Sequence, residues 1–233
     1  MQPMANIALR AARQAGQIML RAMDRLDTLD VQEKGRNDLV SNVDREAETV
    51  IVDALHKAYP EHGILGEEHG RSYTGSGTGN DTEFTWIVDP LDGTTNYLQG
   101  IPHFCVSIGL RKGRQLEHGV IFDPVRNEAF VASRGYGAQL NGKRLRVSKN
   151  TAVAGTRIAM SLPETWLRSR FLPSYLTLVQ QLGPQIELQR ASGSGLLDMA
   201  ELAAGRADAA FVLGLEEQEM HVGSLLLKES GAL

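Results

Sequence analysis

The stretch that decides the fold runs from Trp86 to Asn96 and reads W-I-V-D-P-L-D-G-T-T-N. An apolar run ends in Asp89, and a second carboxylate, Asp92, follows three positions later. Two carboxylates so close in the chain suit a hard divalent cation. The Gly-Thr-Thr turn can present free backbone N–H groups to a phosphate if it starts a helix. The stretch therefore indicates metal-assisted chemistry on a phosphate ester, although D-P-x-D-G is also a common turn between strands.

Two helices are predicted before this stretch. The first lies within the first 22 residues, where apolar side chains recur with helical spacing. The residues that share its apolar face are Met4, Ile7, Ala8, Ala11, Ala15, Ile18, Met19 and Ala22. The second helix should begin near Ser41 or Asn42, both good N-caps, and stop before Pro60. A Gly-, Ser- and Thr-rich segment from Thr74 to Asp81 is predicted to be a flexible loop.

Short β-rich runs between Phe104 and Gly142 are separated by turn signals and predict an antiparallel meander. From residue 151 extended and helical patterns alternate. The expected strands are 157–160, 186–189 and 209–213, and the expected helices are 175–182 and 195–204. We therefore expect a layered α+β / α/β sandwich. Residues 1–150 would form a lobe of helices on a mostly antiparallel sheet that carries the motif, and residues 151–233 a smaller α/β lobe.

Composition narrows the classes of partner. The formal net charge is −4, so no overall basic field would draw the chain to nucleic acid or to a membrane. Cys105 is the only cysteine, which excludes an internal disulfide and fits a reducing compartment. We found no long apolar run at the N-terminus. The expected location is the cytoplasm, without membrane attachment and without direct binding to nucleic acid.

The motif and two flanking segments closely resemble the inositol monophosphatase family, and within it the bacterial extragenic-suppressor type. The flanking segments are G-E-E at Gly66 to Glu68 and I-P-H-F-C-V-S-I-G at Ile101 to Gly109. The resemblance covers nearly the whole chain. It implies a Mg²⁺-dependent hydrolase of inositol monophosphate or similar small polyol phosphates, and typically a homodimer. Bacterial relatives of this type also join the ribosomal-RNA transcription antitermination machinery. A catalytically weakened, protein-binding factor is therefore the alternative.

The resemblance also implies roles for individual residues. The implied metal ligands are Glu67, Asp89, the Leu91 carbonyl, Asp92 and Glu219. The implied catalytic residues are Thr94, Asp44 and Glu67, of which Thr94, held by Asp44, orients the attacking water. The implied substrate-binding residues are Leu91, Asp92, Gly93, Thr94, Arg190, Gly193 and Ser194. Arg190 could instead contact a second subunit.

Several of these residues could instead have a purely structural role. Asp44 follows Ser41 with capping-box spacing and suits a first helical turn. Ser192 and Ser194 are both good helix caps. Glu67 and Glu68 could form a solvated acidic turn, and only the resemblance favours Glu67 as a ligand. His103 and His118 are interpreted as structural, because the six histidines show no metal-ligand spacing.

The chain departs from the family pattern near its end. Val212 stands where the family has a glutamate that binds inositol hydroxyls, and valine cannot accept a hydrogen bond. Gln218 and Glu219 replace a Trp-Asp pair, so the carboxylate for a second metal is one bond longer. The sequence stops at Leu233, where the family continues with further strands. These departures predict weak, poorly selective phosphatase activity and an uncovered sheet edge.

Overall fold

The computed structural model describes residues 1–26, 31–35, 38–68, 71–72, 82–163, 165–213 and 217–232. Side chains are described for the same residues except 31–35, 38–41, 71–72, 165–166 and 217–219. The loop predicted at Thr74 to Asp81 and the side chain of Glu219 therefore lie outside the described part of the chain. Within that part, no helix combines the length and the apolar character needed to cross a bilayer.

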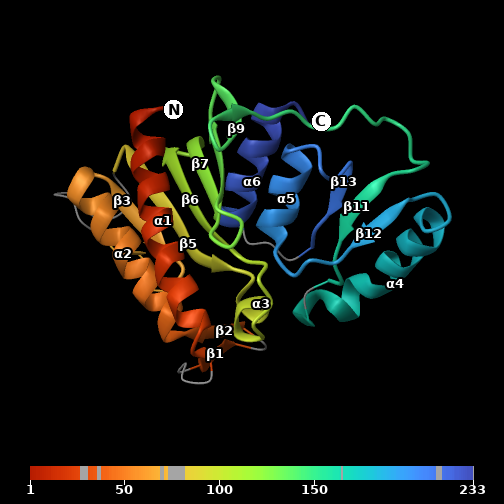
Figure 1. The fold of residues 1–233 in the computed structure, drawn as a ribbon, viewed down its shortest axis with the longest axis horizontal. Helices are drawn as coiled ribbons and strands as arrows, with labels where there is room; N and C mark the ends of the chain where they lie inside the picture. The colour runs from red at the N-terminus through yellow and green to blue at the C-terminus, as the bar shows by residue number, and fades with distance from the viewer. Residues whose placement is uncertain are drawn as a thin grey trace.

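One mixed sheet forms the centre of the molecule (Figure 1). In the described residues it has eight strands in the order β10-β9-β8-β7-β6-β5-β3-β4, and we call it the main sheet. Its strands are β3 (Gly63–Gly66), β4 (Arg71–Ser72), β5 (Phe84–Asp92), β6 (Cys105–Lys112), β7 (Gln115–Asp123), β8 (Glu128–Ser133), β9 (Gly137–Leu140) and β10 (Lys143–Arg144). Every neighbouring pair is antiparallel except β3 and β5, which run parallel. The predicted mostly antiparallel sheet is confirmed, and its one parallel pair includes the motif strand.

The structure confirms the turn predicted at Asn141-Gly142. Leu140 pairs with Lys143, so these two residues form the whole β9–β10 loop. Both have positive φ, at 49° for Asn141 and 80° for Gly142. Asparagine and glycine tolerate this left-handed conformation, which two-residue hairpin loops require.

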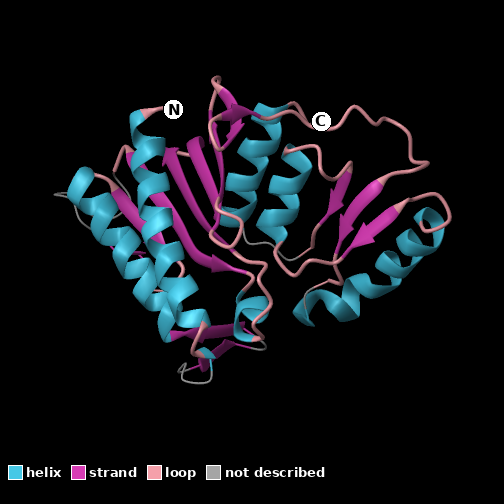
Figure 2. Ribbon diagram, viewed as in Figure 1, coloured by secondary structure: helices cyan, strands magenta, loops and turns pink. Residues whose placement is uncertain are grey.

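Two long helices cover one face of the main sheet (Figures 1 and 2). They are α1 (Pro3–Met23) and α2 (Asn42–Ala58), and α2 follows the β1–β2 hairpin (Val31–Gly35 and Asp38–Ser41). The alanines on the inner face of α1 are fully buried, and small side chains let a helix approach a sheet closely. The helix α2 ends just before Tyr59-Pro60, as expected because the residue before a proline disfavours helix. Both predicted helices are confirmed.

Two further helices pack on the opposite face of the main sheet. They are α5 (Gly195–Ala203) and α6 (Glu217–Ser230), whose buried apolar side chains share a core with Ile87 and Cys105. The helices approach closely because residue 223 is glycine: a Cβ there would overlap the side chain of Met199. The sequence patterns did not predict α6. The division into 1–150 and 151–233 remains a prediction, but these two helices from the second range pack against the main sheet.

The remaining elements form what we call the small lobe, which lies beside the main sheet (Figure 1). It contains β11 (Arg157–Met160), α4 (Thr165–Leu182), β12 (Leu188–Arg190) and β13 (Ala209–Phe211), with strands in the parallel order β12-β11-β13. The predicted start of the helix at 175 is wrong by ten residues, because α4 continues through Pro173. The strand predicted at 186–189 is shifted to 188–190, and the one predicted at 209–213 ends at Phe211.

Candidate metal and phosphate site

Two neighbouring parallel strands carry carboxylates at the same edge of the main sheet. Gly66, the last residue of β3, pairs with Val88 of β5, so the next residues, Glu67 and Asp89, lie at the same level. The Glu67 backbone N–H donates to the Val88 carbonyl at 3.2 Å. Neighbouring strands are about 4.8 Å apart, and the carboxyl ends of parallel strands are common ligand sites in α/β proteins. The register thus places the backbones of Glu67 and Asp89 side by side.

An irregularity in β5 turns Asp92 to the same face of the sheet as Asp89. Residues three apart in a regular strand point to opposite faces. Here Asp89 pairs with Ser107 and Asp92 with Cys105, which are only two apart on β6, so β5 contains one extra residue. Because directly paired residues share a face, both carboxylates lie on the face that α5 and α6 cover. Such bulges commonly redirect a side chain near a functional site.

The segment after Asp89 forms a tight turn of local hydrogen bonds. Asp89 Oδ1 accepts from the Leu91 N–H at 3.0 Å, and the Thr94 hydroxyl donates to the Leu91 carbonyl at 3.0 Å. Gly93 has φ +94°, and a Cβ there would lie 3.1 Å from the His103 carbonyl, so both conformation and space favour glycine. The helix that follows, α3 (Thr94–Leu98), has five residues, so its dipole contributes little to anion binding.

Asp92 is hydrogen-bonded to the N-terminus of α5, a contact that sequence reasoning missed. Its Oδ2 accepts from the Ser194 hydroxyl and from the Leu196 N–H at 3.2 Å, and the Cys105 thiol lies 3.6 Å away. Burial raises the pKa of Asp92, and these hydrogen bonds oppose the rise. Burial also raises the pKa of Cys105, and the charges of Asp92 and Asp89 raise it further. The carboxylate therefore joins the motif strand to α5.

Ser194 has the capping role that the sequence offered and also contacts Asp92. It is the N-cap of α5, where its hydroxyl accepts from the Leu197 N–H at 3.3 Å, and the same hydroxyl donates to Asp92. Gly193 precedes it with φ +79°. A Cβ at Gly193 would lie 2.8 Å from Asn96 Oδ1, and Asn96 Nδ2 donates to the Ser192 carbonyl at 2.8 Å. Asn96, which was not assigned a role, thus ties α3 to the loop before α5.

Asp44 lies close to the helix that carries Thr94. It is 2% exposed, in the first turn of α2. Burial raises the pKa of Tyr97, and the negative charge of Asp44 raises it further. Tyr97 is three residues after Thr94, which puts the two on neighbouring positions of α3. The Tyr97 hydroxyl donates to the Met19 carbonyl at 2.9 Å and so anchors α3 to α1.

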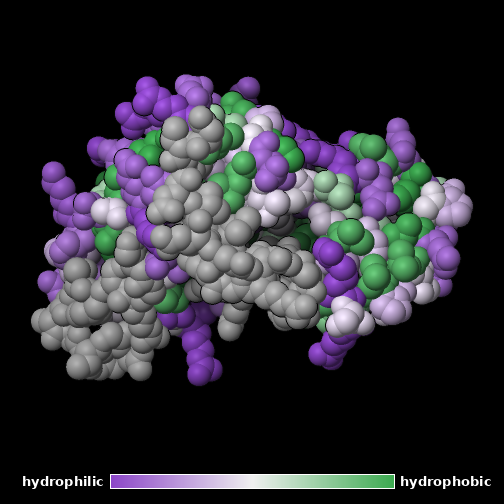
Figure 3. Space-filling view, turned by 90° about the horizontal axis from the view of Figure 1, so that it is seen from below, coloured by the Kyte–Doolittle hydropathy of each residue, from purple (hydrophilic) through white to green (hydrophobic). Residues whose placement is uncertain are grey.

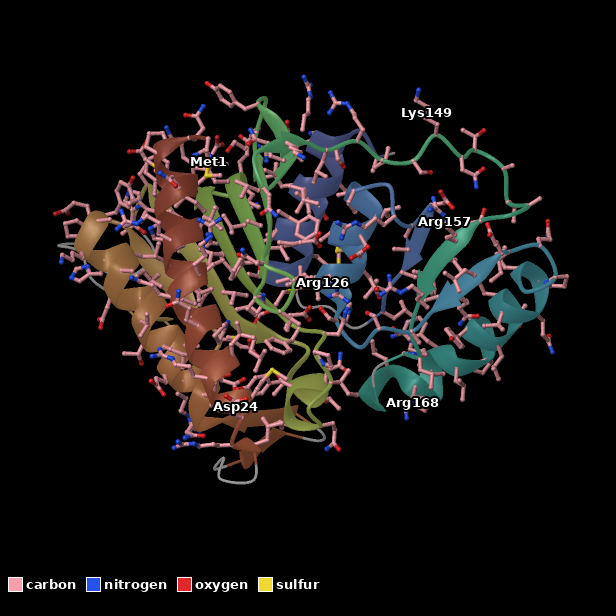
Figure 4. All side chains as sticks on the ribbon, in the orientation of Figure 1. Met1, Asp24, Arg126, Lys149, Arg157 and Arg168 are labelled. Carbon is pink, nitrogen blue, oxygen red and sulfur yellow. The ribbon has the colours of Figure 1, made fainter. Side chains whose placement is uncertain are left out.

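Two arginines, Arg126 and Arg190, lie near His103. Arg126 donates to Asp123 at 2.6 Å and to His103 Nδ1 at 3.3 Å, and Figure 4 labels Arg126 at the junction with the small lobe. Because arginine only donates, Nδ1 is an acceptor and the ring is neutral. Burial and the charge of Arg126 lower the pKa of His103. Arg190 lies 4.0 Å from Glu201 and is 43% exposed.

The donor set suits Mg²⁺ in chemistry, although it is not a closed cage. Among the described side chains, no three carboxylate, imidazole or thiol groups come together to hold a metal ion. The candidate oxygen donors at this edge of the main sheet are the Glu67, Asp89 and Asp92 carboxylates and the Leu91 carbonyl. Mg²⁺ usually binds through one or two carboxylates and keeps several waters, which this open arrangement permits. These residues fit the ion as oxygen donors.

The raised pKa of Asp198, a buried carboxyl near Asp92, can be tested by its effect on stability. It is 3% exposed on α5, and its pKa is raised to about 6, first by burial and then by the charges of Asp92 and Glu201. A hydrogen bond from Ser192 and the charge of Arg190 oppose the rise. When folding raises the pKa of a carboxyl group, the folded protein is destabilised at pH values where the group is ionised in the unfolded chain. The rise in the pKa of Asp198 from its ordinary value of 3.8 to about 6 corresponds to about 3 kcal/mol of lost stability at pH 8.

We therefore expect Asp198→Asn to be more stable than the parent at pH 8, by up to about 3 kcal/mol. The difference should shrink as the pH falls below about 6 and vanish near about pH 3, where Asp198 is largely protonated in both the folded and the unfolded chain. Urea unfolding at about pH 3, 6 and 8 measures the difference. A variant that is less stable than the parent at pH 8 would contradict the assignment.

The fold is an inositol monophosphatase-like α/β sandwich. It has helices on both faces of one mixed sheet, a small parallel lobe, and carboxylates at the ends of paired strands. The chain belongs to the inositol monophosphatase family, whose family model matches residues 1–233. It is 49% identical over 233 residues to "Nus factor SuhB" of Pseudomonas aeruginosa, covering 100% of this chain and 85% of that protein.

Solved structures show the same fold. The extragenic suppressor protein suhB from Bartonella henselae superposes with a TM-score of 0.89 at 37% identity, over 97% of this chain and 84% of that one. The inositol monophosphatase from Anabaena superposes with a TM-score of 0.80 at 31% identity, over 97% and 81%. The family resemblance and the predicted fold class are therefore confirmed.

Proposed function

We propose that this protein acts as a Nus factor, a protein-binding factor in ribosomal-RNA transcription antitermination. The observation that carries the proposal is the 49% identity, over all 233 residues, to a relative named as a Nus factor. A binding role requires the fold and its surface but no catalytic turnover. It is therefore compatible with Val212 and Glu219 at positions where the family pattern differs.

The surface of the small lobe supports a role in protein contacts. Figure 3 shows apolar residues gathered at the end of the molecule that the small lobe forms. Large apolar side chains exposed by about half in this lobe are Leu162, Leu176 and Leu188. Exposed apolar side chains gathered at one end of a molecule can mark contacts between proteins. The partners would be transcription-machinery proteins or a second copy of the chain, and we expect a homodimer in the cytoplasm.

Readthrough of a terminator placed behind a ribosomal-RNA leader tests the antitermination role. A Pseudomonas aeruginosa transcription extract depleted of its Nus factor SuhB should lose readthrough and regain it when this protein is added. Asp89→Asn should restore readthrough as well as the parent does, because a binding role does not use the metal site. A parent protein that leaves readthrough at the depleted level would refute the antitermination role.

A second candidate function is Mg²⁺-dependent hydrolysis of inositol monophosphate or a similar small polyol phosphate. It is favoured by the register of β3 on β5 and the irregularity in β5, which together bring Glu67, Asp89 and Asp92 to one edge of the main sheet. Bound Mg²⁺ would lower the pKa of a water molecule and shield the phosphate charge. The Glu67, Asp89 and Asp92 carboxylates and the Leu91 carbonyl would hold the ion.

The remaining residues would bind and orient the reactants. The Thr94 hydroxyl, with Asp44 behind it, would orient the attacking water in line with the phosphorus atom. The backbone N–H groups of Gly93 and Thr94 would hold the phosphate oxygens, since first-turn N–H groups lack intrahelical partners. On the polyol side, the Arg190–Ser194 loop would contribute Arg190, Gly193 and Ser194.

Phosphate release from inositol 1-phosphate, with and without Mg²⁺, tests the hydrolase directly. We expect slow release, because Val212 cannot bind a substrate hydroxyl. The release should require Mg²⁺ and should be abolished by Asp89→Asn, which removes a carboxylate from the proposed ligand set. The result separates the two candidate functions. Readthrough activity without phosphate release would leave the protein as a binding factor alone.

A further inference from the structure

The turn that carries Glu67 is built around a buried carboxylate on another element. Glu48 lies on α2 and is 0% exposed. Its Oε2 accepts from the backbone N–H of Glu68 at 2.8 Å. A buried carboxylate is costly unless it is hydrogen-bonded, so a glutamate at this position indicates a specific structural task.

The glycine that opens the turn is fitted to the same carboxylate. A Cβ at Gly66 would lie 2.5 Å from Glu48 Cδ and 2.7 Å from Glu48 Oε2, which is closer than real Cβ contacts allow. Glu48 therefore packs directly on the Cα of Gly66 while it binds the N–H of Glu68. It contacts the residues on both sides of Glu67.

The strand β5 holds the same turn from the other side. Gly66 pairs with Val88, and the Glu67 N–H donates to the Val88 carbonyl at 3.2 Å. The backbone of Glu67 is thus fixed between α2 and β5, at the level of Asp89. The side chain of Glu67 itself is exposed, so its direction depends on the backbone that carries it.

We infer that Glu48 is a positioning residue that fixes the Gly66–Glu68 turn and so directs the Glu67 carboxylate toward a cation beside Asp89. This inference rests on the proposed Mg²⁺ site. Groups that hold a metal-ligating residue in place typically contribute 10- to 100-fold to metal affinity. Glu48→Ala should therefore weaken Mg²⁺ binding about 10- to 100-fold, even in the absence of substrate.

Three variants and the parent test the inference by two measurements that do not involve turnover. Calorimetric titration measures Mg²⁺ affinity, and amide hydrogen exchange measures protection of the Glu68 N–H in the metal-free protein. Glu48→Ala should lose both affinity and protection. Glu48→Gln keeps an oxygen that accepts the Glu68 N–H, so it should recover the protection and most of the affinity. Glu46→Ala, which removes an exposed carboxylate from the same helix, is the matched control and should resemble the parent.

Gly66→Ala provides a second route if Glu48→Ala does not fold. The added methyl group forces the Glu48 carboxylate away, and it should lower both protection and affinity. Unchanged protection of the Glu68 N–H in every folded variant of Glu48 and Gly66 would overturn the inference, whatever the protein does with Mg²⁺. A parent that binds no Mg²⁺ would instead overturn the proposed metal site. Lost protection with affinity within twofold of the parent would show that the turn does not position a ligand.

Discussion

Replacing Thr94 by alanine should lower the turnover number for inositol 1-phosphate by about 10²- to 10⁴-fold, with a much smaller change in KM. The hydroxyl would act on the attacking water, whereas the backbone N–H groups that hold phosphate are untouched. The structure also bounds the cost to folding. The variant loses one hydrogen bond, from the Thr94 hydroxyl to the Leu91 carbonyl, which is worth about 1 kcal/mol.

Thr94→Ser is the matched control because it retains a hydroxyl at the same position. It should recover most of the turnover. Steady-state kinetics at saturating Mg²⁺, with urea unfolding of all three proteins, separates the effect on rate from the effect on stability. If KM rises strongly in Thr94→Ala while kcat is kept, Thr94 binds phosphate and does not orient water.

Two substitutions of Asp92 should abolish turnover but differ in their effect on stability. Asp92→Asn preserves the shape and an oxygen that can accept the Leu196 N–H, so the fold should survive. It removes a negative charge from the ligand set, and Mg²⁺-dependent turnover should fall by more than about 100-fold, the upper range for indirect partners of a metal. Asp92→Ala also leaves the Ser194 hydroxyl and the Leu196 N–H without their acceptor. It should therefore lower the free energy of unfolding by about 1–3 kcal/mol.

Phosphate-release assays and urea unfolding of both variants measure the two effects separately. Cys105→Ser changes another buried neighbour of the Asp92 carboxylate without removing the acceptor, and it serves as a control for disturbance of this region. Asp92→Asn with the turnover of the parent would exclude Asp92 as a ligand. Asp92→Ala with the stability of the parent would show that the contact with α5 contributes nothing to folding.

Patterns local in sequence predicted the elements best. The apolar periodicity of the first 22 residues, the stop before Pro60 and the Asn141-Gly142 turn all depend on neighbouring residues, and the structure confirms them. The prediction that the small-lobe helix starts at 175 is wrong, because a proline inside a helix reads as a helix breaker and α4 nonetheless continues through Pro173. The helix α6 was missed because its amphipathic pattern is weak.

Contacts between segments far apart in the chain could not be predicted from the sequence. Nothing in the motif reveals that Asp92 accepts hydrogen bonds from α5, about 100 positions later, or that Asn96 binds the Ser192 carbonyl. The role of Glu48 is equally hidden, because a glutamate at position 48 reads as an ordinary solvated helix residue. Only its complete burial, and its contact with Gly66 and Glu68, distinguish it.

The sequence by itself determined the family, the two N-terminal helices on a mostly antiparallel sheet and the candidate residues, because motif spacing and apolar period are carried by the chain. Tertiary structure alone decided how those residues meet. Asp89 and Asp92 stand three apart, and a regular strand would send them to opposite faces of the main sheet. The extra residue in β5 brings both carboxylates to one face. The parallel register with β3 places the Glu67 backbone alongside Asp89. The physical reason is that the pairing between strands, and not the spacing of residues along one strand, sets where a side chain lies.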